Sequence, residues 1–490
     1  MKKYFLLFFT LYCLTSYISK AQSTLWGMAT YGGADGVGVI FSMPTGSTSL
    51  NVRYSFPTCN CGNNPQGSLL AASNGKLYGL ANTGLYVKGQ IFSFDTVTNT
   101  YKDEYDIPRS WGGMSSSNNI YANLIQTSNG MMYGMTEEGG LGGGNIFSFN
   151  PVNDSATDLH DFNTSLFGDG SHPYGSLLQA YDSNLYGMTY EGGDSGAGTI
   201  FSYDINTNIE TVVYSLKAST GYGPYGNLIQ AKDSTLYGLT QYGGKYGLYG
   251  GTLFSYNIKS GLYSMLVQFN DTGNGENPEG SLVQATNGKL YGMTRHGGHK
   301  NDGTLFSYNP TSQQFTALIE FNDMNGGNPL NESSPMQASN GKLYGMTLYG
   351  GTDDYGVVYE YDITTSTYTI KTSFDNTNGL DPTGSLIELG TSSASVPKIN
   401  TSNNFCTVYP NPSTGIFTIS FAGAQNFMPS TIEIYNVLGE KVYSNSYQPL
   451  ANSYQLKTID LSLQANGIYL YRVIAQHGNL IGEGKVVIQK

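Results

Sequence analysis

One short step of sequence, a leucine or methionine followed by an aromatic residue and a glycine, recurs along most of this chain. It appears at Leu25-Trp26-Gly27, Leu77-Tyr78-Gly79, Met132-Tyr133-Gly134, Leu185-Tyr186-Gly187, Leu236-Tyr237-Gly238, Leu290-Tyr291-Gly292 and Leu343-Tyr344-Gly345. These seven copies are spaced 51 to 55 residues apart. A period of this length indicates a repeat architecture in which one unit has the size of a propeller blade.

Each unit contains four strand-like runs, which we name strands a to d. In one unit they are Gly280–Ala285, Lys289–Thr294, Thr304–Asn309 and Phe315–Phe321. Asn287-Gly288 joins strands a and b, which predicts a two-residue type I′ hairpin turn. Strand c is apolar or small on both faces, so we expect each sheet to have neighbours on both sides, as stacked blades do.

The two ends of the repeat region complement each other. The first copy begins at strand b, Leu25–Thr30, without a strand a before it, whereas a surplus strand a, Gly384–Leu389, follows the last strand d. We expect Gly384–Leu389 to complete the first sheet and to close seven four-stranded blades into a ring. Pro335 lies in another strand a, which fits an edge strand at the inside of the ring.

The segments outside the repeats have different characters. Lys2 and Lys3 precede the apolar run 4–18, which predicts a signal peptide, residues 1–21, cleaved after Ala21. No other run is long enough for a transmembrane helix. The repeat region is expected to span 22–390, followed by a Ser/Thr/Asn-rich linker, 391–404. Alternating runs in 405–490 predict a second all-β domain, a small Ig-like sandwich.

Composition excludes nucleic acid as a partner, and it allows two states for Cys59 and Cys61. The net charge is −12 with 23 Lys and Arg, so no basic surface is available for nucleic acid. Besides the signal peptide, only Cys59, Cys61 and Cys406 remain, which is too few for a disulfide framework. Cys59 and Cys61 are either free thiols or a strained local disulfide.

Loops at one end of the blades are the expected binding face. In an a-b-c-d meander the b–c and d–a loops share one end, and here they are rich in Gly, Tyr and acidic residues, so we place any ligand there. The ligand-binding residues predicted on this face are Glu137, Glu138, Glu191, Tyr242, Tyr246, His296, His299, Asp302, Asp353 and Tyr355. The alternative is that these loops only form glycine-dependent turns.

The sequence contains no complete motif for a metal site or for catalysis. His296, His299 and Asp302 suggest zinc, but they share one Gly-rich loop with no further ligand, so we expect neither a metal nor a cofactor. Glu137, Glu138 and Glu191 could form the carboxylate pair of a hydrolase, although nothing in the sequence fixes their separation. No nucleophile elbow or nucleotide-binding glycine pattern occurs in a strand-to-helix context, and we assign no catalytic residue.

The repeat resembles the bacterial tandem repeats called GloVer, through Gly-Ser-Leu-Leu-Gln-Ala, Leu-Tyr-Gly-Met-Thr, Gly-Gly and Gly-Thr-Ile-Phe-Ser-Tyr. It is more distantly similar to kelch repeats, which also have Gly-Gly after the second strand. The resemblance covers about residues 25–389. It implies a propeller and says little of function, because propellers include enzymes, lectins and scaffolds.

The C-terminal segment looks like a type A sorting domain of type IX secretion. Motif residues are Pro410, Asn411, Pro412, Gly415, Gly439, Gly467, Tyr469 and Lys485. The resemblance implies interaction with the type IX secretion machinery and export across the outer membrane, to the cell surface or the extracellular space. In this family the domain is commonly removed, and the cargo is either anchored or released.

Together these features predict a monomeric secreted or cell-surface protein that binds a glycan or a surface protein without catalysis. Two alternatives remain, an extracellular enzyme of propeller fold that acts on polysaccharide and a structural or adhesive surface component. A site with two or three carboxylates at hydrolytic distance would favour the enzyme.

Overall fold

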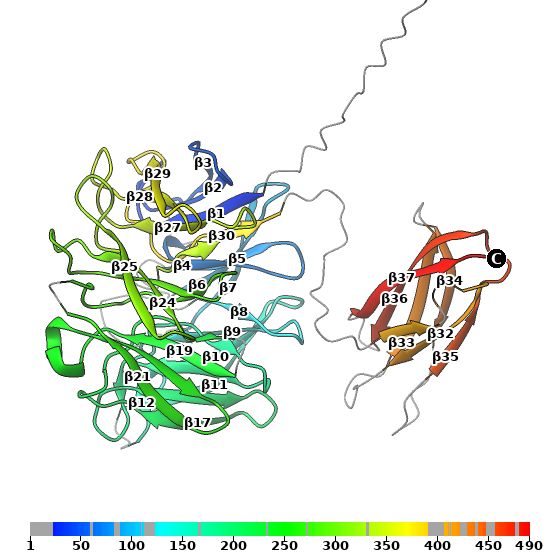
Figure 1. Ribbon diagram of the computed structural model, residues 1–490, viewed down its shortest axis with the longest axis horizontal. Helices are drawn as coiled ribbons and strands as arrows, with labels where there is room; N and C mark the ends of the chain where they lie inside the picture. Colours follow the sequence, from blue (N-terminus) through cyan, green and yellow to red (C-terminus); the bar gives the residue numbers. More distant parts are fainter. Residues whose placement is uncertain are drawn as a thin grey trace, which may run out of the picture. The chain divides into compact units, whose positions relative to one another are not determined.

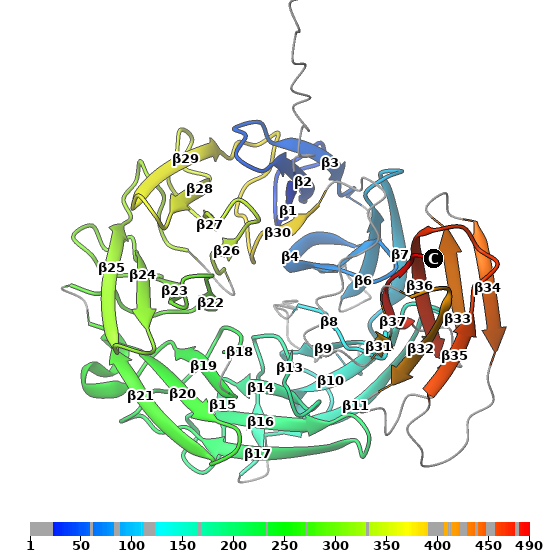
Figure 2. The same ribbon diagram turned by 45° about the vertical axis from the view of Figure 1, so that its right-hand side comes forward.

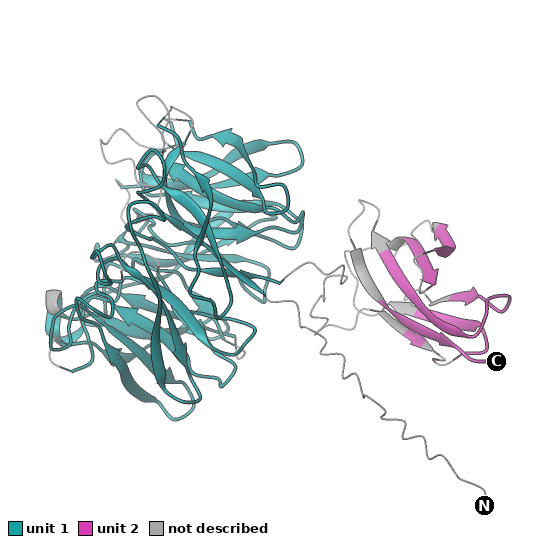
Figure 3. Cartoon of the chain, turned by 90° about the horizontal axis from the view of Figure 1, so that it is seen from above, with its two compact units in different colours: residues 1–393 teal, residues 394–490 magenta. Residues whose placement is uncertain are grey.

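The computed structural model describes residues 23–490 except 59–61, 83–88, 109, 112–122, 165–167, 232–233, 271–272, 330–332, 391–405, 410, 412, 422–428, 437–439, 447–455 and 476–479. The chain divides into two compact units, residues 1–393 and 394–490 (Figure 1, Figure 3). The predicted signal peptide, the predicted linker and the pair Cys59 and Cys61 lie outside the described residues.

The first unit contains seven four-stranded antiparallel sheets among its described residues. Sheet 1 is β30 (Ile387–Leu389), β1 (Thr24–Ala29), β2 (Val39–Pro44) and β3 (Asn51–Ser55). Sheet 2 is β4 (Asn63–Ala71), β5 (Leu77–Asn82), β6 (Gln90–Asp95) and β7 (Thr100–Asp106). Sheet 3 is β8 (Ile125–Gln126), β9 (Met132–Thr136), β10 (Gly142–Asn150) and β11 (Ser155–Asn163). Sheet 4 is β13 (Leu178–Gln179), β14 (Leu185–Thr189), β16 (Thr199–Asp204) and β17 (Ile209–Ser215).

The remaining elements of this unit follow the same plan. Sheet 5 is β18 (Ile229–Gln230), β19 (Thr235–Thr240), β20 (Thr252–Asn257) and β21 (Leu262–Gln268). Sheet 6 is β22 (Val283–Gln284), β23 (Leu290–Thr294), β24 (Thr304–Asn309) and β25 (Gln314–Glu320). Sheet 7 is β26 (Met336–Gln337), β27 (Leu343–Thr347), β28 (Val357–Asp362) and β29 (Thr367–Ser373). A two-stranded pair, β12 (Gly170–Ser171) with β15 (Glu191–Gly192), and one 3-10 helix, η1 (Gly244–Tyr249), lie in the loops.

The sheets follow one another around a common centre, with their first strands toward the centre and their last strands outside (Figure 2). The strand order a-b-c-d predicted from the repeat holds in every sheet. This arrangement is an all-β, propeller-like fold, and Pro335 directly precedes an inner edge strand, β26, as expected.

The first sheet combines the two ends of the repeat region. β30 pairs with β1 in antiparallel register, with Ile387 opposite Trp26. β30 is shorter than the predicted run because the residues before it, from Gly384 to Leu386, make no ladder with β1. The predicted pairing of the surplus strand with the first copy is therefore present.

A chain of hydrogen bonds links the segments that lead into successive first strands. In each bond the backbone N–H of one sheet donates to a side-chain oxygen of the next: Ser68 to Asn123, Asn123 to Ser176, Ser176 to Asn227, Asn227 to Ser281, Ser334 to Ser385, and Ser385 to Ser68. The last bond joins sheet 1 to sheet 2, so it connects the end of the repeat region, before β30, to β4 near its start.

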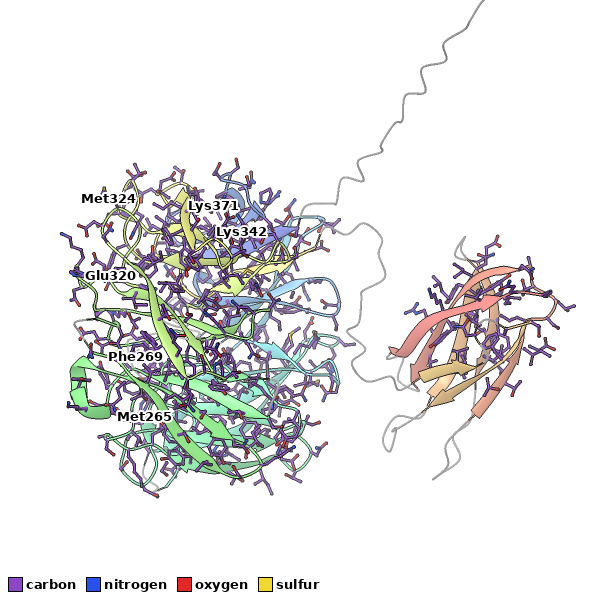
Figure 4. All side chains as sticks on the ribbon, in the orientation of Figure 1. Met265, Phe269, Glu320, Met324, Lys342 and Lys371 are labelled. Atoms are coloured by element: carbon purple, nitrogen blue, oxygen red, sulfur yellow. The ribbon has the colours of Figure 1, made fainter. Side chains whose placement is uncertain are left out.

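The core lies between neighbouring sheets, because both faces of each middle strand are covered. One cluster joins Leu239 and Leu253 of sheet 5 to Leu290 and Phe306 of sheet 6. The recurring glycine leaves room for the aromatic ring on the paired strand. A Cβ on Gly187 would lie 2.4 Å from Cζ of Phe201, its partner in that strand. Figure 4 shows side chains filling the space between the ribbons.

The turn between strands a and b differs from the prediction. The N–H of Gly288 donates to the Ala285 carbonyl and the N–H of Ala285 to the Lys289 carbonyl, which makes a three-residue loop with Gly288 at φ 80°. The prediction of a two-residue type I′ turn is wrong. The asparagine has a different task, because Asn287 Nδ2 donates to the Tyr291 hydroxyl at 2.8 Å and so satisfies that buried phenol.

A bulge recurs at one position in strand d. The register of the last two strands shifts between Ile200 and Phe201 in sheet 4, and the same shift occurs in the other six sheets. Bulges increase twist and redirect side chains, so this feature shapes the outer edge of every sheet. The sequence pattern did not predict it.

The second unit has two antiparallel sheets. One contains β31 (Cys406–Tyr409), β32 (Ile416–Phe421) and β35 (Leu456–Asp460), and the other β34 (Lys441–Ser446), β33 (Pro429–Asn436), β36 (Gly467–Ala475) and β37 (Leu480–Ile488). Phe417 and Ile419 of the first sheet share a buried core with Ile434 and Val473 of the second. The unit is therefore a small β-sandwich.

Candidate functional site

The b–c and d–a loops lie at the same end of the sheets and pair directly. Tyr222, after strand d of sheet 4, forms a two-way backbone bridge with Tyr242 of the b–c loop in sheet 5. Glu276 and His296 form the equivalent bridge between sheets 5 and 6. These bridges fix the loop backbones, so the side chains beside them are held in defined positions.

Two variable positions inside the repeat meet beside these bridges. One is the residue between Pro and Gly that leads into strand a, and the other is the residue directly after strand b. Together they supply a group that we name the mouth cluster: Glu137, Tyr174, Tyr190, Tyr225, Gln241, Glu279 and Arg295. Its members either lead into strand a of sheets 4 to 6 or directly follow strand b of sheets 3 to 6.

Three tyrosines form the aromatic part of the mouth cluster. The rings of Tyr174 and Tyr225 are stacked with centroids 4.1 Å apart, and Tyr190 meets both rings edge-on at 5.2 and 5.5 Å. All three side chains are half-buried, so each ring is partly open to solvent. Such a packed group of rings is rigid, and it offers apolar surface beside three hydroxyl groups.

Glu137 lies at one end of these rings. Burial raises the pKa of Glu137 to about 7, while a hydrogen bond with the Tyr174 side chain opposes that shift and the neighbouring charge of Glu138 adds to it. The carboxyl group is therefore divided between its neutral and charged forms near neutral pH. It can donate or accept a hydrogen bond in a ligand complex.

An ion pair lies at the other end, where the Tyr190 hydroxyl donates to Gln241 Oε1 at 3.4 Å. Arg295 Nη1 contacts Glu279 Oε1 at 2.8 Å, and Gln241 Nε2 donates to the same oxygen. Burial raises the pKa of Glu279, and Arg295 and Gln241 oppose that rise. The Glu279 side chain is 1% exposed and the Arg295 side chain 37% exposed.

Two atoms of this ion pair lack hydrogen bonds. Glu279 Oε2 and Arg295 Nε are both buried and have no partner among the described residues. Buried polar atoms in native proteins nearly always have partners, so an unpaired acceptor beside an unpaired donor is a feature of an incomplete site. The protein itself therefore leaves hydrogen-bonding capacity unused at this ion pair, one acceptor and one donor.

Among the predicted residues, Glu137 belongs to the mouth cluster and Tyr242 contacts its member Tyr190. A hydrogen bond with Tyr242 contributes to raising the pKa of Tyr190, after the effect of burial. Glu138 and Glu191 act there through their charge, since they raise the pKa of Glu137 and Tyr190 respectively. Glu191 itself is exposed and lies 3.7 Å from His172 Nδ1.

The other predicted residues do not join the mouth cluster. Tyr246 is exposed on η1, with Lys245 Nζ 5.7 Å from its ring centroid. His299 is exposed and pairs with Glu320, 2.6 Å away, and Glu320 lies at the edge of the first unit in Figure 4. Asp353 is exposed, and Tyr355 packs against the core of sheets 1 and 7.

The predicted trio His296, His299 and Asp302 does not form a ligand group. His299 contacts Glu320, whereas His296 is half-buried with Nδ1 3.5 Å from the Asn301 carbonyl. Burial raises the pKa of Asp302, and the charges of Asp323 and Asp354 add to that rise. These three residues are not among the described groups that could hold a metal ion.

Sequence reasoning missed six members of the cluster: Tyr174, Tyr190, Tyr225, Gln241, Glu279 and Arg295. The sequence does contain a signal for them, because one position varies between constant residues of the repeat. The middle residue differs, but Pro and Gly are constant, in Pro173-Tyr174-Gly175, Pro224-Tyr225-Gly226 and Pro278-Glu279-Gly280. These positions lie outside the long b–c loops on which most of the predicted residues lie. In a repeat protein the residues that change within an otherwise constant segment are the ones free to serve a ligand.

Comparison with protein families accounts for most of the chain. The model of the Gloeobacter/Verrucomicrobia repeat matches residues 14–250 and 220–409. The chain belongs to this repeat family. Residues 407–489 of this repeat protein match the secretion system C-terminal sorting domain. This second match indicates interaction with the type IX secretion machinery and export to the cell surface or the extracellular space.

Solved structures resemble the fold of the repeat protein. A putative 6-phosphogluconolactonase from Bacteroides uniformis has 14% sequence identity and a TM-score of 0.50, covering 76% of this chain and 100% of its own. Another from Bacteroides fragilis has 15% identity and a TM-score of 0.51, covering 76% of this chain and 99% of its own. At this identity the likeness concerns the fold alone.

PorZ, a surface component of the type IX secretion system of Porphyromonas gingivalis, has 13% identity and a TM-score of 0.43. It covers 93% of the repeat protein and 63% of its own chain, and likeness at this level carries no functional argument. No curated protein matches the chain. Within the part of the chain that the structure describes, no helix has the length and apolar character to cross a membrane.

The sorting motif has a visible structural role in the second unit. Asn411 Nδ2 donates to the Lys485 carbonyl at 2.9 Å, and its Oδ1 accepts from the Val487 N–H at 2.8 Å. Gly415 has a φ of 113°, and a Cβ there would lie 2.6 Å from the Ser462 backbone. Tyr469 is buried and donates to the Ala465 carbonyl, Gly467 begins β36, and Pro410, Pro412 and Gly439 lie outside the described residues.

Proposed function

We propose that this repeat protein binds a glycan at the mouth cluster after its export to the cell surface or the extracellular space. The observation that carries the proposal is the packed group Tyr174, Tyr190 and Tyr225 next to a Glu279–Arg295 pair with two unpaired buried atoms. A pyranose ring has an apolar face of C–H groups and an edge of hydroxyl groups. Rings beside a few fixed polar groups match both features.

The scaffold in this proposal is a seven-bladed propeller, residues 22–390, closed into a ring by β30. The pairing of β30 with β1 and the hydrogen bond from Ser385 to Ser68 support closure. We further propose that residues 1–21 are a signal peptide, 391–404 a linker and 405–490 an Ig-like sorting domain, and that the exported protein is a monomer. A closed ring would hold the mouth cluster rigid, which lowers the entropy cost of binding.

A hydroxyl-rich ligand explains the polar part of the site better than an apolar one. The Arg295 side chain is 37% exposed, and a small shift of the ion pair on binding would let a sugar hydroxyl donate to Glu279 Oε2 and accept from Arg295 Nε. Glu137, with its pKa of about 7, can donate a hydrogen bond to a second hydroxyl when neutral or accept one from it when charged. A surface protein could meet the same rings, and it is an outcome of the binding test below.

Catalysis is the second candidate, and one observation favours it. A carboxyl group with a pKa of about 7, as in Glu137, suits a general acid. Hydrolysis also needs a second carboxylate at a set distance, and the charge that Glu137 feels comes from Glu138, which follows it in the chain. We therefore put non-catalytic binding first. The structural or adhesive alternative needs no ligand site at all.

A glycan array with the purified full chain tests the proposal. We expect retention of a defined set of glycans, and weakening of about tenfold or more for Tyr174→Ala and Tyr225→Ala, since a lost aromatic contact typically costs over 1 kcal/mol. The matched control is Tyr214→Ala, because Tyr214 stacks on Tyr263 at 4.3 Å in the outer strands, away from the cluster.

Each outcome has a separate meaning. Equal retention by all four proteins would contradict the assignment of the site. Retention of no glycan by the wild type would overturn the proposal in favour of a protein partner or a structural role. Release of reducing ends from a retained glycan, lost in Glu137→Gln, would establish the enzyme.

A further inference from the structure

A second polar group lies in the first unit, apart from the mouth cluster. His160 of β11, Asp169 before β12 and Glu210 of β17 each offer one ligand atom, and these atoms all lie within 4.8 Å of one another. β11 and β17 are the last strands of sheets 3 and 4, so the three residues join the outer parts of two neighbouring sheets (Figure 1, Figure 2).

The repeat itself shows what packing requires at this place. Tyr214 lies opposite Ile200 in sheet 4, as His160 lies opposite Ile146 in sheet 3. Tyr263 lies opposite Tyr256 in sheet 5, as Glu210 lies opposite Tyr203 in sheet 4. The next junction thus has Tyr214 and Tyr263 where this one has His160 and Glu210.

Those tyrosines form a satisfied apolar contact. Their rings are stacked at 4.3 Å with an interplanar angle of 2°, and the Tyr263 hydroxyl donates to the Thr220 carbonyl at 3.0 Å. Tyr54 and Tyr101 form the same stack between sheets 1 and 2, at 4.4 Å and 1°. The fold can therefore form with two tyrosines at these positions, and it does not require the imidazole of His160 or the carboxylate of Glu210.

The third residue also has a counterpart. Asp169 precedes Gly170 and Thr220 precedes Gly221, and a Cβ on either glycine would strike the two threonines that begin and end the neighbouring strands. Where sheet 5 has a threonine whose carbonyl accepts from a tyrosine, sheet 4 has a carboxylate. All three positions between sheets 3 and 4 therefore hold residue types that ligate metals, where the corresponding positions between sheets 4 and 5 hold Tyr214, Tyr263 and Thr220.

The unpaired atoms make the case more specific. His160 Nε2 and Glu210 Oε1 are buried and have no hydrogen-bond partner among the described residues. By contrast, the Asp169 carboxylate is held by two backbone donors, Asn163 N–H and Gly170 N–H, both at 2.9 Å. His160 is held by its edge-on contact with Phe162, with centroids 4.9 Å apart. Oriented ligands with free lone pairs are the arrangement that a metal site needs.

We propose that His160, Asp169 and Glu210 bind a divalent transition-metal ion, Zn²⁺ by preference, which links sheets 3 and 4. One imidazole and two carboxylates suit Zn²⁺ better than the oxygen-only sites of Ca²⁺ and Mg²⁺. Three protein ligands leave a position for water, and the side chains would close around the ion by small rotations. Two carboxylates that would repel each other then share one cation.

Titration of the full chain, produced without a histidine tag, with ZnCl₂ tests this site. We expect one tight site in calorimetry, weak or no binding of Ca²⁺, and a melting temperature that rises with Zn²⁺ concentration, since binding to the folded state alone stabilises it. The key variant is the double substitution His160→Tyr and Glu210→Tyr, which copies the neighbouring junction. We expect it to fold and to lose the Zn²⁺ site.

Two further variants keep the test decisive if the double variant fails to fold. Asp169→Asn should weaken Zn²⁺ binding about tenfold or more. His299→Gln, which removes an exposed histidine, should bind as the wild type does. The proposal is overturned if the wild type binds no Zn²⁺ above the level of the Tyr double variant or of Asp169→Asn, or if binding is lost in His299→Gln instead. Failure here leaves the glycan proposal untouched.

Discussion

The backbone N–H of Ser385 donates a 2.7 Å hydrogen bond to Oγ of Ser68, although 317 residues separate the two in the chain. Ser68 in turn donates its own N–H to Asn123 of sheet 3. One serine therefore connects the segment before β30 to sheets 2 and 3. A bond between residues so far apart in the chain restricts the conformational freedom of the whole segment between them, so its loss should lower the global stability.

Ser68→Ala should lower the free energy of unfolding by about 1 kcal/mol, because the Ser385 N–H loses its acceptor. Urea denaturation of the full chain, followed by tyrosine fluorescence, measures the change. Ser73→Ala is the matched control, since Ser73 lies in the turn of the same sheet with an exposed side chain. Equal stability of the two variants would contradict a role for the Ser68–Ser385 bond.

The glycine of the recurring step should be intolerant of a methyl group. In Gly187→Ala the new Cβ would lie 2.4 Å from Phe201 Cζ, so the ring must move and we expect a loss of about 1–3 kcal/mol. Adding Phe201→Leu should recover part of that loss, giving a coupling energy in a double-mutant cycle. Gly273→Ala is the control, because its Cβ meets nothing within 4 Å. Additive effects of the two substitutions would refute this explanation.

The fold could be predicted because the same strand pattern occurs in seven copies, so a strand that is hard to recognise in one copy is clear in the others. Seven copies of one pattern identified the strands of each sheet. The first copy, at Leu25–Thr30, lacks a strand a and Gly384–Leu389 is a surplus strand a, which identified the pairing of the two ends. The predicted turn failed because Asn-Gly is compatible with more than one loop. Gly288 takes the positive φ, while the Asn287 side chain bonds to Tyr291, a contact that a dipeptide rule does not include.

The candidate site could be predicted only in part, for a geometric reason. Glu137 was found because it is an acid on a loop, but its partner Tyr174 belongs to the next sheet, 37 residues later in the chain. Contacts across sheets depend on the register of neighbouring repeats, which a single copy does not contain. The same limit hid His160 and Glu210, which are 50 residues apart and are unusual only by comparison with Tyr214 and Tyr263.

Glu137 should give the protein a pH-dependent stability. Its pKa is raised on folding from 4.5 to about 7, so its neutral form is favoured in the folded state. That contribution is complete below about pH 4.5 and is lost as the pH rises through about 7. Glu137→Gln should therefore gain about 1–2 kcal/mol relative to the wild type between pH 4.5 and 8, a figure reduced for partial solvent access.

Urea denaturation at several pH values measures this difference. Val152→Ala, which changes an exposed side chain without an ionisable group, is the control and should alter the stability equally at every pH. A stability difference between Glu137→Gln and the wild type that stays constant from pH 4.5 to 8 would contradict the raised pKa.

Asn411 should be needed for export, because it joins the start of the second unit to its last strand. Asn411→Ala removes both the bond to the Lys485 carbonyl and the bond from the Val487 N–H, at a cost of about 1–2 kcal/mol to that unit. In a host with type IX secretion we expect less protein outside the cell and more in the periplasm, measured by fractionation and immunoblotting. Asn445→Ala, on the exposed part of β34, should be exported as the wild type is, and deletion of 405–490 should abolish export. Normal export of Asn411→Ala would show that sorting depends on the motif by some route other than these two hydrogen bonds.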